Sequence, residues 1–526
     1  MSITVGLDFG THQTKVCIEN NDNPGNVYYE FLSFDDLNGN KCYCLPSIIQ
    51  INNDHTISYG FCNDNNCLYD DSVVDIKEPE YLKEPELKYP PKPSEPKEFD
   101  VKTAFTAGKD LLPWQMVLLS IKQRSEYKRS PEYQKWLSVN NNYELELEKW
   151  EEECTIIKNN YLNEIERINK INDKLRTEYK EKQEKAELSK KLLFKYFKQA
   201  VYDYGNSVFK IDPMLLSIWY LSYIIFIVKE KHGNYFSIQM GVPCDILNHK
   251  RRRSVGTSLL LSAYYLVEDV FNNNFNDFIS AKYEDLIDAT KIIDFDESIK
   301  YEYGILIFPE ACACLNRMVY NNKITPNRLH VIVDIGGGTT DISFFSIYDN
   351  KPDIFKYISM PYGLNYIREK CSNKNKILDD TLVKRYYYVK VKEIINNLIY
   401  EVKCEFKKQT NRPIKILDDV IDNNMSLYVG GGSTYNLLCM GYECFEDVKR
   451  LDSSLFPIKV TNTKINLNEY AILANAYGLA HSEKDDNVKL QSIKQLFSGI
   501  SLQDKSVFTI LDEQNKYGYE HGLTDL

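Results

Sequence analysis

Three glycine-bearing turns, each directly after an apolar, strand-like run, constrain this chain more than any other feature. They read VGLDFGTHQTKVCI (5–18), VIVDIGGGTTDISFF (331–345) and SLYVGGGSTYNLL (426–438). A tight turn needs one or two glycines, whereas consecutive glycines let backbone N–H groups approach an anion and form a concave nest for phosphate. Each turn alone is also consistent with an ordinary hairpin, but the order of the three favours a phosphate-binding fold.

Carboxylates and hydroxyls accompany the first two turns. The residues concerned are Asp8, Gly10 and Thr11 in the first turn and Asp334, Gly336, Gly337, Gly338, Thr339 and Thr340 in the second. A carboxylate alone repels a polyphosphate, but a carboxylate that holds hydrated Mg²⁺ supports one, because Mg²⁺ keeps several waters and takes few protein ligands. Neither a Walker A sequence nor a kinase-type glycine loop is present, so any phosphate handling is of another kind.

Length, charge and cysteine usage exclude several classes. The chain has 526 residues with 43% hydrophobic, enough for two to four domains. Its net charge of -11 argues against nucleic acid as the main partner, since phosphate backbones are bound by clustered Lys and Arg. The 13 cysteines contain no CxxC pair and fit reduced thiols. The most apolar run, 214–228, is shorter than the roughly 20 residues of a membrane span. We expect a cytoplasmic protein without direct nucleic-acid or membrane contact.

Residues 110–204 read as a helical insertion. Between Pro131 and Gly205 there is no further glycine or proline, and apolar residues recur at heptad spacing. The seam consists of Leu147, Trp150, Cys154, Ile157, Tyr161, Ile168, Ile171 and Leu175. Because a seam needs a partner, we expect an antiparallel coiled-coil hairpin with the stretch that precedes it, 111–137; pairing with another molecule and a single exposed helix are the alternatives. The Pro-, Glu- and Lys-rich run within 63–100 is expected to lie extended on the surface.

Alternating strand and helix patterns fill the rest of the chain. After the third glycine turn, we expect a helix. The predicted organisation is 1–109 for the first part of lobe I, 110–204 for the inserted hairpin, 205–333 for the second part of lobe I, 334–460 for lobe II, and 461–526 for a helix returning to lobe I and a short tail.

In this order the motifs resemble the actin-like ATPase superfamily, and within it the nucleotide-binding domain of DnaK-type seventy-kilodalton heat-shock chaperones. GLDFGTHQTKV resembles the phosphate 1 loop, VDIGGGTTDIS the phosphate 2 loop and YVGGGST the adenosine motif. FPEACACLNRMVY and NEYAILANAYGLA resemble the two connecting helices. The resemblance covers roughly 1–105 and 205–480, and implies an α/β, two-lobed, ribonuclease-H-like fold that binds Mg²⁺ and ATP.

The resemblance also implies roles for the acidic residues. Asp8 and Asp334 would hold the Mg²⁺ shell. Glu310 and Asp341 would order the attacking water or act as base, and Thr339 would lie near the γ-phosphate.

A lysine completes the implied catalytic set. Lys102, in the sequence Phe-Asp-Val-Lys, would steady the water and the γ-phosphate, and Lys77 is a competing choice. The residues implied to contact the nucleotide are Asp8, Gly10, Thr11, His12, Gln13, Gly336, Gly337, Gly338, Thr339, Gly430, Gly431, Gly432 and Ser433.

The chain departs from the chaperone pattern in several places. His12 and Gln13 stand where the chaperones usually have a threonine and an aromatic residue, and Tyr435 stands where they place an adenine-stacking arginine. The subdomain that caps the nucleotide is reduced. About 45 residues follow the last helix, too few for the chaperones' peptide-binding half, and no apolar interdomain linker is visible.

These patterns predict a chaperone-like ATPase that hydrolyses ATP to ADP slowly as a conformational switch. It would lack the peptide-binding domain and contact an unidentified protein partner through the 110–204 hairpin. The alternatives are a filament-forming actin-like protein, a nucleotide sensor without turnover, and a sugar or acetate kinase.

Overall fold

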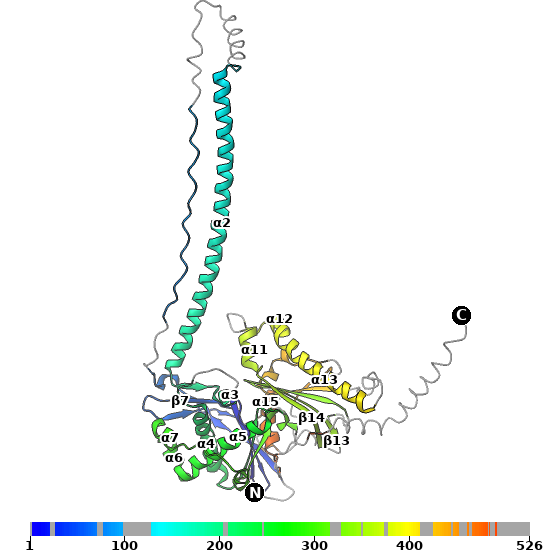
Figure 1. The fold of residues 1–526 in the computed structure, drawn as a ribbon. Coiled ribbons are helices and arrows are strands. Elements are labelled where there is room, and N and C mark those ends of the chain that lie inside the picture. Colours follow the sequence, from blue (N-terminus) through cyan, green and yellow to red (C-terminus); the bar gives the residue numbers. More distant parts are fainter. Residues whose placement is uncertain are drawn as a thin grey trace, which may run out of the picture. The chain divides into compact units, whose positions relative to one another are not determined.

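The structure is a computed structural model, and the chain forms two compact units, Met1–Asp70 with Lys191–Leu526, and Asp71–Lys190 (Figure 1). The described residues are 3–21, 27–70, 77–97, 128–202, 209–244, 247–315, 324, 328–348, 351–372, 377–410, 424–442, 445–451, 460–461, 465, 467–481, 483, 486 and 490–491. The separate unit begins and ends earlier than the insertion predicted at 110–204.

A six-stranded sheet organises the first part of the larger unit. β1, β2 and β3 are antiparallel neighbours, and β10 and β11 run parallel to β1. All six residues of β1 are buried, as a central strand covered on both faces requires. In spatial order the strands are β11 (Ile305–Pro309), β10 (Ser237–Val242), β1 (Ile3–Asp8), β2 (Gln13–Asn20) and β3 (Tyr28–Phe31), with β6 (Leu45–Pro46) also pairing β2.

A five-stranded sheet repeats the same topology in the second part. Its order is β14 (Lys351–Met360), β13 (Thr340–Tyr348), β12 (His330–Ile335), β15 (Met425–Val429) and β16 (Asp447–Arg450). The first three strands along the chain are antiparallel neighbours, and β15 and β16 run parallel to β12. In each sheet the strands therefore lie in the order 3-2-1-4-5, and the unit is a mixed α/β structure built from two copies of one strand arrangement.

α4 (Pro213–His232) is the central helix of the first core. Asp212 caps it by accepting a hydrogen bond from Met214 N–H at 2.9 Å, Pro213 takes the first helical position, and Gly233 ends it at φ 82°. Among the described residues α4 is the one helix long and apolar enough to span a membrane, and 67% of its apolar window is buried inside the protein. It packs on α5 (His249–Tyr265) and α3 (Phe197–Val201).

Two helices connect the sheets. α9 (Glu310–Ala313) contacts strands of both sheets, and so does α15 (Leu467–Leu479). The helices cross at Gly478, where a Cβ would collide with the carbonyl of Ala313, so only glycine permits this approach. Both connecting helices agree with the predicted positions, although residues 316–320 of the first prediction lie outside the described residues.

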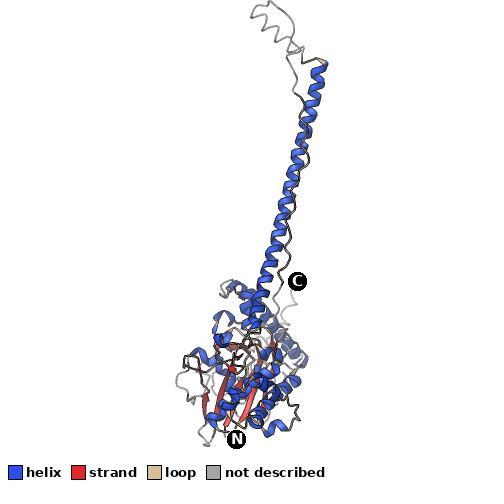
Figure 2. Cartoon of the chain, turned by 90° about the vertical axis from the view of Figure 1, so that its left-hand side faces the viewer, coloured by secondary structure: helices blue, strands red, loops and turns tan. Residues whose placement is uncertain are grey.

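The second sheet is covered by helices that form its own core. These are α11 (Leu364–Cys371), α12 (Asp380–Val383), a π-helical segment (Lys384–Tyr388) and α13 (Val389–Thr410). Figure 2 shows the strands of this unit with helices on either side.

The helix predicted after the third glycine turn is wrong. Two short 3-10 segments follow instead, Gly431–Thr434 and Asn436–Leu438. The hydroxyls of Ser433 and Thr434 donate to the carbonyls of Gly430 and Gly431 at 2.7 and 2.8 Å, and such local bonds compete with helical ones.

The remaining elements are short and lie at the edges. The strands are β4 (Phe34–Asp35), β5 (Lys41–Cys42), and a small sheet of β8 (Ile57–Tyr59), β7 (Ile48–Ile51) and β9 (Leu193–Lys195). The helices are α6 (Phe275–Ser280), α7 (Tyr283–Ala289), α8 (Ile299–Glu302), a 3-10 turn (Asp64–Asn66) and a π segment (Leu266–Val270).

The segment after α15 returns to both halves of this unit. Asp486 pairs with Lys300 at 2.9 Å, pairs with Arg253, and accepts a hydrogen bond from Ile307 N–H at 3.1 Å. Leu490 then forms a parallel bridge with Ile354 of β14.

The smaller unit contains one long helix and an extended segment beside it (Figures 1 and 2). α2 spans Pro131–Lys190, and its 60 residues extend about 90 Å at 1.5 Å per residue. Ser130 caps the helix, since its hydroxyl accepts a hydrogen bond from Tyr133 N–H at 3.2 Å.

Residues 77–97 run antiparallel to α2. The indole N–H of Trp136 donates to the Lys97 carbonyl at 3.0 Å, and that of Trp150 donates to the Pro90 carbonyl at 2.9 Å. Fourteen helix residues (150 − 136) thus match seven segment residues (97 − 90). Both stretches measure about 21 Å, at about 1.5 and 3.1 Å per residue, so the segment is as extended as polyproline II.

The amide of Asn172 fixes the far end of the segment. It donates to the Leu82 carbonyl and accepts from the Leu82 N–H, both at 2.9 Å. The eight predicted seam residues are all buried or half-buried. Residues 111–127 of the predicted helical partner lie outside the described residues, but its last residues, 131–137, form the first turns of α2 and continue without a break into the seam. The antiparallel hairpin predicted with 111–137 is therefore wrong, and the observed cover of the seam is extended chain.

Candidate functional site

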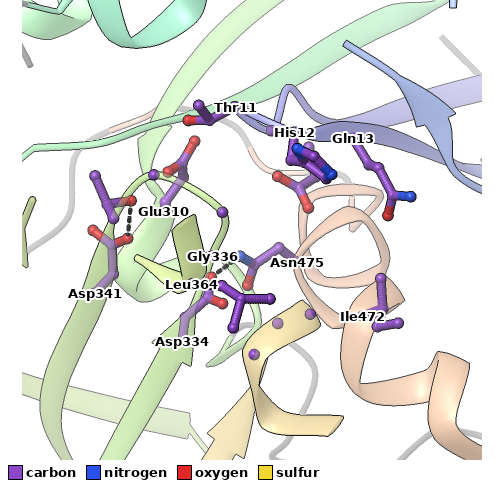
Figure 3. A pocket seen from close by; sticks show the side chains of 18 of the residues that line it. Thr11, His12, Gln13, Glu310, Asp334, Gly336, Asp341, Leu364, Ile472 and Asn475 are labelled. Atoms are coloured by element: carbon purple, nitrogen blue, oxygen red, sulfur yellow. Dashed lines mark hydrogen bonds between the residues drawn. The ribbon is translucent and has the colours of Figure 1, made fainter. Parts of the chain in front are cut away.

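The three glycine turns meet at one cavity of about 270 Å³ in the larger unit (Figure 3). Most residues implied for nucleotide and catalysis line it: Asp8, Gly10, Thr11, His12, Gln13, Glu310, Asp334, Gly336, Gly337, Gly338, Thr339, Asp341, Gly430, Gly431 and Gly432. Ser433 is buried behind the third turn and donates to the Gly430 carbonyl instead. Lys102 lies outside the described residues, and Lys77 is an exposed residue of the other unit.

The first turn carries a paired carboxylate. Asp8 ends β1 and Lys15 lies opposite it on β2, and their charged groups are 3.0 Å apart. Burial alone would lower the pKa of Lys15, but the nearby Asp8 outweighs it, and the pKa is raised. This aspartate is therefore neutralised from within its own hairpin.

The second turn carries an aspartate without such a partner. Asp334 ends β12 and accepts a hydrogen bond from the Asn475 amide of α15 at 2.5 Å (Figure 3). Burial and the neighbouring Asp8 raise the pKa of Asp334 to about 7. Within the described part of the chain no cation forms an ion pair with Asp334, so its ionised form is energetically unfavourable.

Glu310 and Lys198 form a buried ion pair at the cavity wall. Glu310 begins α9, and Lys198 comes from α3, the first helix after the smaller unit. Burial raises the pKa of Glu310, and Lys198 opposes this only in part. Lys198 is thus a cavity lysine beside Glu310, and it is a candidate for the role with the water and the γ-phosphate that the resemblance gave to Lys102.

Asp341 lies opposite Asp334 on the paired strand β13. It accepts a hydrogen bond from the Thr339 hydroxyl at 2.8 Å (Figure 3). Burial, together with the charges of Glu310 and Asp334, raises its pKa well above the usual value. Asp341 has no ion-pair partner among the described residues.

The third turn packs against the second. Gly430 adopts φ 81°, and a Cβ there would collide with Asp334 Oδ1 and the Ile335 carbonyl. Its N–H donates to the Ala471 carbonyl of α15 at 2.8 Å. Only glycine satisfies both demands, and the turn consequently lies directly beside the Asp334 carboxylate.

The two phosphate-type turns touch each other across the cavity. A Cβ on Gly337 would collide with His12, and one on Gly338 would collide with Thr11 and with Gln199. The Gln199 amide also donates to the Gly338 carbonyl at 3.3 Å. Burial and the nearby Arg368 lower the pKa of His12, so its imidazole is held neutral beside the turns.

The outer end of the cavity has a different character. Arg368 of α11 donates a hydrogen bond to the Tyr435 hydroxyl, and its guanidinium carbon is 5.4 Å from the centre of the Tyr435 ring. Leu364 and Ile472 also line the cavity. Arg368 is exposed, whereas the four carboxylates are buried.

A divalent cation fits the charges of the site. Four buried carboxylates, Asp8, Glu310, Asp334 and Asp341, face the half-buried Lys15 and the buried Lys198. The carboxylates outnumber these lysines by two, with Arg368 at the outer end of the cavity, and the raised pKa values of Asp334 and Asp341 reflect this excess. The described residues contain no cluster of three or more His, Cys, Asp or Glu suited to direct metal ligation. A cation held largely through its waters, as Mg²⁺ prefers, is consistent with both findings.

Several cavity residues were not found from the sequence. Lys15 lies within the first quoted motif but was given no role, and Lys198 lies in no predicted motif. Asn475 offered one signal, since it is an amide among the small residues of the helix that was predicted to return to lobe I. Arg368 lies on a short helix that no predicted motif included.

Comparisons with known proteins give little. No protein-family model matches the chain, and no curated protein matches it. A solved structure, an exopolyphosphatase from Cytophaga hutchinsonii ATCC 33406, matches with 14% identity and a TM-score of 0.20. The match covers 43% of this chain and 53% of the exopolyphosphatase chain. A TM-score this low supports no inference about function, so function is inferred from the residues of the site.

Proposed function

We propose that this chain is an actin-like ATPase of the heat-shock-chaperone type, which binds Mg-ATP in this cavity and hydrolyses it slowly. The observation that carries the proposal is the cavity's composition. It joins glycine turns from two sheets of identical topology to four carboxylates and two lysines. The repeated 3-2-1-4-5 strand order supports the ribonuclease-H-like, two-lobed fold that the resemblance implies.

Backbone N–H groups of the glycine turns would bind the phosphates. Gly336, Gly337 and Gly338 offer consecutive amides, and Thr11 adds a hydroxyl from the opposite turn. Such a site acts by positioning and by electrostatic stabilisation, because phosphoryl transfer to water needs little covalent help from the protein.

The buried acids and Lys198 would handle the attacking water. A carboxylate with a raised pKa is the better proton acceptor at neutral pH, and burial raises the pKa of both Glu310 and Asp341. Lys198, held by Glu310, would orient the water and stabilise charge that develops on the terminal phosphate.

Asp8 and Asp334 would hold Mg²⁺ through its waters. When bound, the ion neutralises the phosphates and the two excess carboxylate charges of the cavity. Glu310 and Asp341 remain free of this role and available to the water.

The smaller unit would serve as the partner-contacting element. Its support is the 60-residue helix, which is far longer than a nucleotide site needs. Coupling of nucleotide state to a protein partner through this unit is the switch that we propose. The 12 described cysteines are all free thiols, which supports a reducing, cytoplasmic location.

Calorimetric titration with ATP, with and without Mg²⁺, tests the proposal on the wild type and on Asp8→Ala and Asp334→Ala. We expect Mg²⁺-dependent binding that both variants weaken, and phosphate release from ATP by the wild type. Binding that is unchanged in both variants would contradict the site. Binding without phosphate release would reduce the proposal to a nucleotide sensor.

A further inference from the structure

Two residues close to Lys198 in the chain contact the two phosphate-type turns, and the proposed hydrolysis gives neither of them a role. Tyr196 stacks on His12 of the first turn, with ring centres 6.2 Å apart and ring planes inclined by 19°. The Gln199 amide donates a hydrogen bond to the Gly338 carbonyl of the second turn at 3.3 Å. Neither Tyr196 nor Gln199 lines the cavity, so each can act on the reaction only through the residues that it contacts.

The backbone of Tyr196 fixes the direction in which α3 leaves the preceding strand. Its φ of 62° and ψ of 18° lie in the left-handed region, which few residues other than glycine adopt. Its carbonyl accepts hydrogen bonds from the N–H groups of Gln199 and Ala200 at 3.0 and 3.4 Å, so α3 starts from this residue. Backbone strain of this kind persists only where the surroundings hold it, and the stack on His12 is one such support.

α3 holds Lys198 at the cavity on a rigid base. Phe197, the first residue of the helix, is fully buried and packs on Phe9 and Tyr220, with ring centres 6.2 and 5.6 Å apart. The Lys198 ammonium lies 5.5 Å from the centre of the Phe9 ring, a cation–π distance. The lysine is therefore held by Glu310, by Phe9 and by the direction of its own helix. A shift of α3 would move the ammonium relative to both turns.

The chain reaches Tyr196 directly from the smaller unit. α2 ends at Lys190, the last residue of that unit, and β9 (Leu193–Lys195) begins after two further residues. Lys198 lies eight residues after the end of the long helix (198 − 190). No glycine or proline lies between Lys190 and Gln199, so this path contains no residue with the backbone freedom of glycine.

The chains that lead into and out of the smaller unit are paired with each other inside the larger one. Tyr69 and Lys191 form an antiparallel bridge, and the Leu192 N–H donates to the Leu68 carbonyl at 2.9 Å. The Ile51 N–H of β7 donates to the Leu192 carbonyl at 2.9 Å, and the Ile51 carbonyl accepts from the Leu68 N–H at 2.8 Å. Because β9 continues this pairing on β7, a displacement at the end of α2 would be transmitted along hydrogen-bonded strands to the start of α3.

We propose that Tyr196 and Gln199 are positioning residues that hold Lys198 against the two phosphate-type turns, and that the smaller unit regulates ATP hydrolysis through them. The inference rests on the proposed function, since it concerns the rate of that reaction. A partner bound to the smaller unit would move β9 and thereby α3, and would change the rate of hydrolysis more than the affinity for ATP. Coupling of this kind is reciprocal, so ATP bound at the turns would also stabilise the pairing of β9.

Single-turnover hydrolysis by the full chain, beside equilibrium titration with Mg-ATP, tests the two positioning roles. Tyr196→Asn tolerates the left-handed backbone but lacks the ring, and should lower the rate about 10-fold while ATP affinity stays within about 2-fold. Tyr196→Phe keeps the ring and should retain the wild-type rate. Gln199→Leu removes the amide at similar size and should lower the rate about 5-fold. Tyr235→Asn, at a tyrosine that is 83% exposed, is the matched control and should behave as the wild type.

Hydrogen exchange measured by mass spectrometry tests the connection to the smaller unit. In the wild type we expect Mg-ATP to slow exchange of the β9 amides, and of the paired chain at 68–70, at least about 3-fold. The double variant Tyr196→Asn with Gln199→Leu should still bind Mg-ATP, which shows that it is folded, but should lose this protection. Strand β16, at the edge of the second sheet, is the internal reference and should respond alike in both proteins.

The outcomes distinguish this inference from the proposed function. A wild-type rate in Tyr196→Asn or in Gln199→Leu would overturn the positioning roles, as would a rate in Tyr196→Phe as low as that in Tyr196→Asn. Loss of ATP affinity in proportion to the rate would show a general loss of the site and overturn them too. Protection of β9 that persists in the double variant, or that is absent from a wild type that binds ATP, would overturn the connection to the smaller unit. A wild type that does not bind Mg-ATP would overturn the proposed function itself.

Discussion

The two phosphate-type hairpins hold the same place in two sheets of the same topology, yet their charges differ. The strand register pairs Asp8 with Lys15 in the first and Asp334 with Asp341 in the second. Six residues separate the members of each pair, 9–14 and 335–340, so the turns have equal length. The equivalent cross-strand position thus holds a lysine in one hairpin and a carboxylate in the other.

The difference shows which half of the chain supplies the cations that pair with the carboxylates of the site. Lys15 and Lys198 both belong to the half that contains the first sheet, and each pairs with a carboxylate there. Asp334 and Asp341 have no ion-pair partner among the described residues. The second hairpin therefore holds buried carboxylates without a compensating cation, and this lowers the stability of the fold.

The largest effect is expected when a lysine of the first half is replaced. Lys198→Met should lower the rate of ATP hydrolysis roughly 100- to 1,000-fold, because the developing phosphate charge loses its preorganised cation, while ATP affinity changes little. Single-turnover phosphate release measures the rate. Lys195→Met, at the exposed last residue of β9 three residues earlier, is the charge control. Hydrolysis within about 10-fold of the wild type would show that Lys198 is only a partner of Glu310.

Neutralising the second hairpin should separate binding from stability. Asp334→Asn keeps the bond from Asn475 but removes a buried charge, so Mg-ATP affinity should fall about 100-fold. The melting temperature of the nucleotide-free protein should rise, because a charge without a partner has gone. Calorimetry and thermal melts test both, with the exposed Asp447→Asn as control. A lower melting temperature would contradict the idea that this hairpin is charge-strained.

The unpaired buried carboxylate of Asp334 should also make the stability of the protein depend on pH. The folded pKa of Asp334, about 7, lies above its ordinary value of 3.8, so the folded state holds this proton more tightly. Its stabilising contribution is full below 3.8 and is lost as pH rises through about 7. Nucleotide-free wild type should lose roughly 2–3 kcal/mol of unfolding free energy from this group between about pH 5 and 8. Denaturant melts of Asp334→Asn should show a flatter profile, and parallel profiles would refute the assignment.

Adjacent glycines of the third turn allow a matched steric test. Gly430→Ala forces a Cβ against Asp334 Oδ1 at a positive φ, whereas Gly431→Ala meets nothing within 4 Å. We expect Gly430→Ala to cost about 2 kcal/mol of unfolding free energy and Gly431→Ala less than about 1 kcal/mol. Urea melts of the two variants would decide. Equal losses of unfolding free energy would show that close contact between Gly430 and Asp334 does not limit this turn.

The sequence predicted the carboxylates of the site better than its cations. Asp8 and Asp334 each precede a glycine turn at the end of a strand, so the local pattern suggested them, whereas the resemblance to the chaperone motifs suggested Glu310 and Asp341. Lys198 was missed because 120 residues of the smaller unit separate it from the first sheet, and the local Phe-Asp-Val-Lys pattern drew attention to Lys102. Residues that only tertiary packing brings together have no characteristic spacing along the sequence.

The cover of the long helix α2 could not be predicted from the sequence either. Its seam was visible in the heptad pattern, but the pattern cannot specify what covers the seam. Between the tryptophan bonds at Lys97 and Pro90, the proline-rich segment advances one residue for every two residues of the helix. At the mouth of the site, Tyr435 was recognised as a departure, but its contact Arg368 comes from another helix.

The smallest effect is expected from substitutions at equivalent threonines of the two hairpins. Thr14 and Thr340 each precede the paired residue by one position. The Thr340 hydroxyl donates to the Tyr362 carbonyl at 2.7 Å, whereas the Thr14 hydroxyl meets the Ser47 hydroxyl at 3.1 Å, and Ser47 also donates to the Gly10 carbonyl.

Replacing each threonine by valine removes the hydroxyl at nearly constant volume. Thr340→Val strands the Tyr362 carbonyl and should cost about 1–2 kcal/mol of unfolding free energy. Thr14→Val leaves Ser47 with its second partner and should cost about 0.5–1 kcal/mol. Denaturant melts without nucleotide measure both. A larger loss at Thr14 would mean that the first hairpin, despite its internal ion pair, depends more on its surroundings than the second.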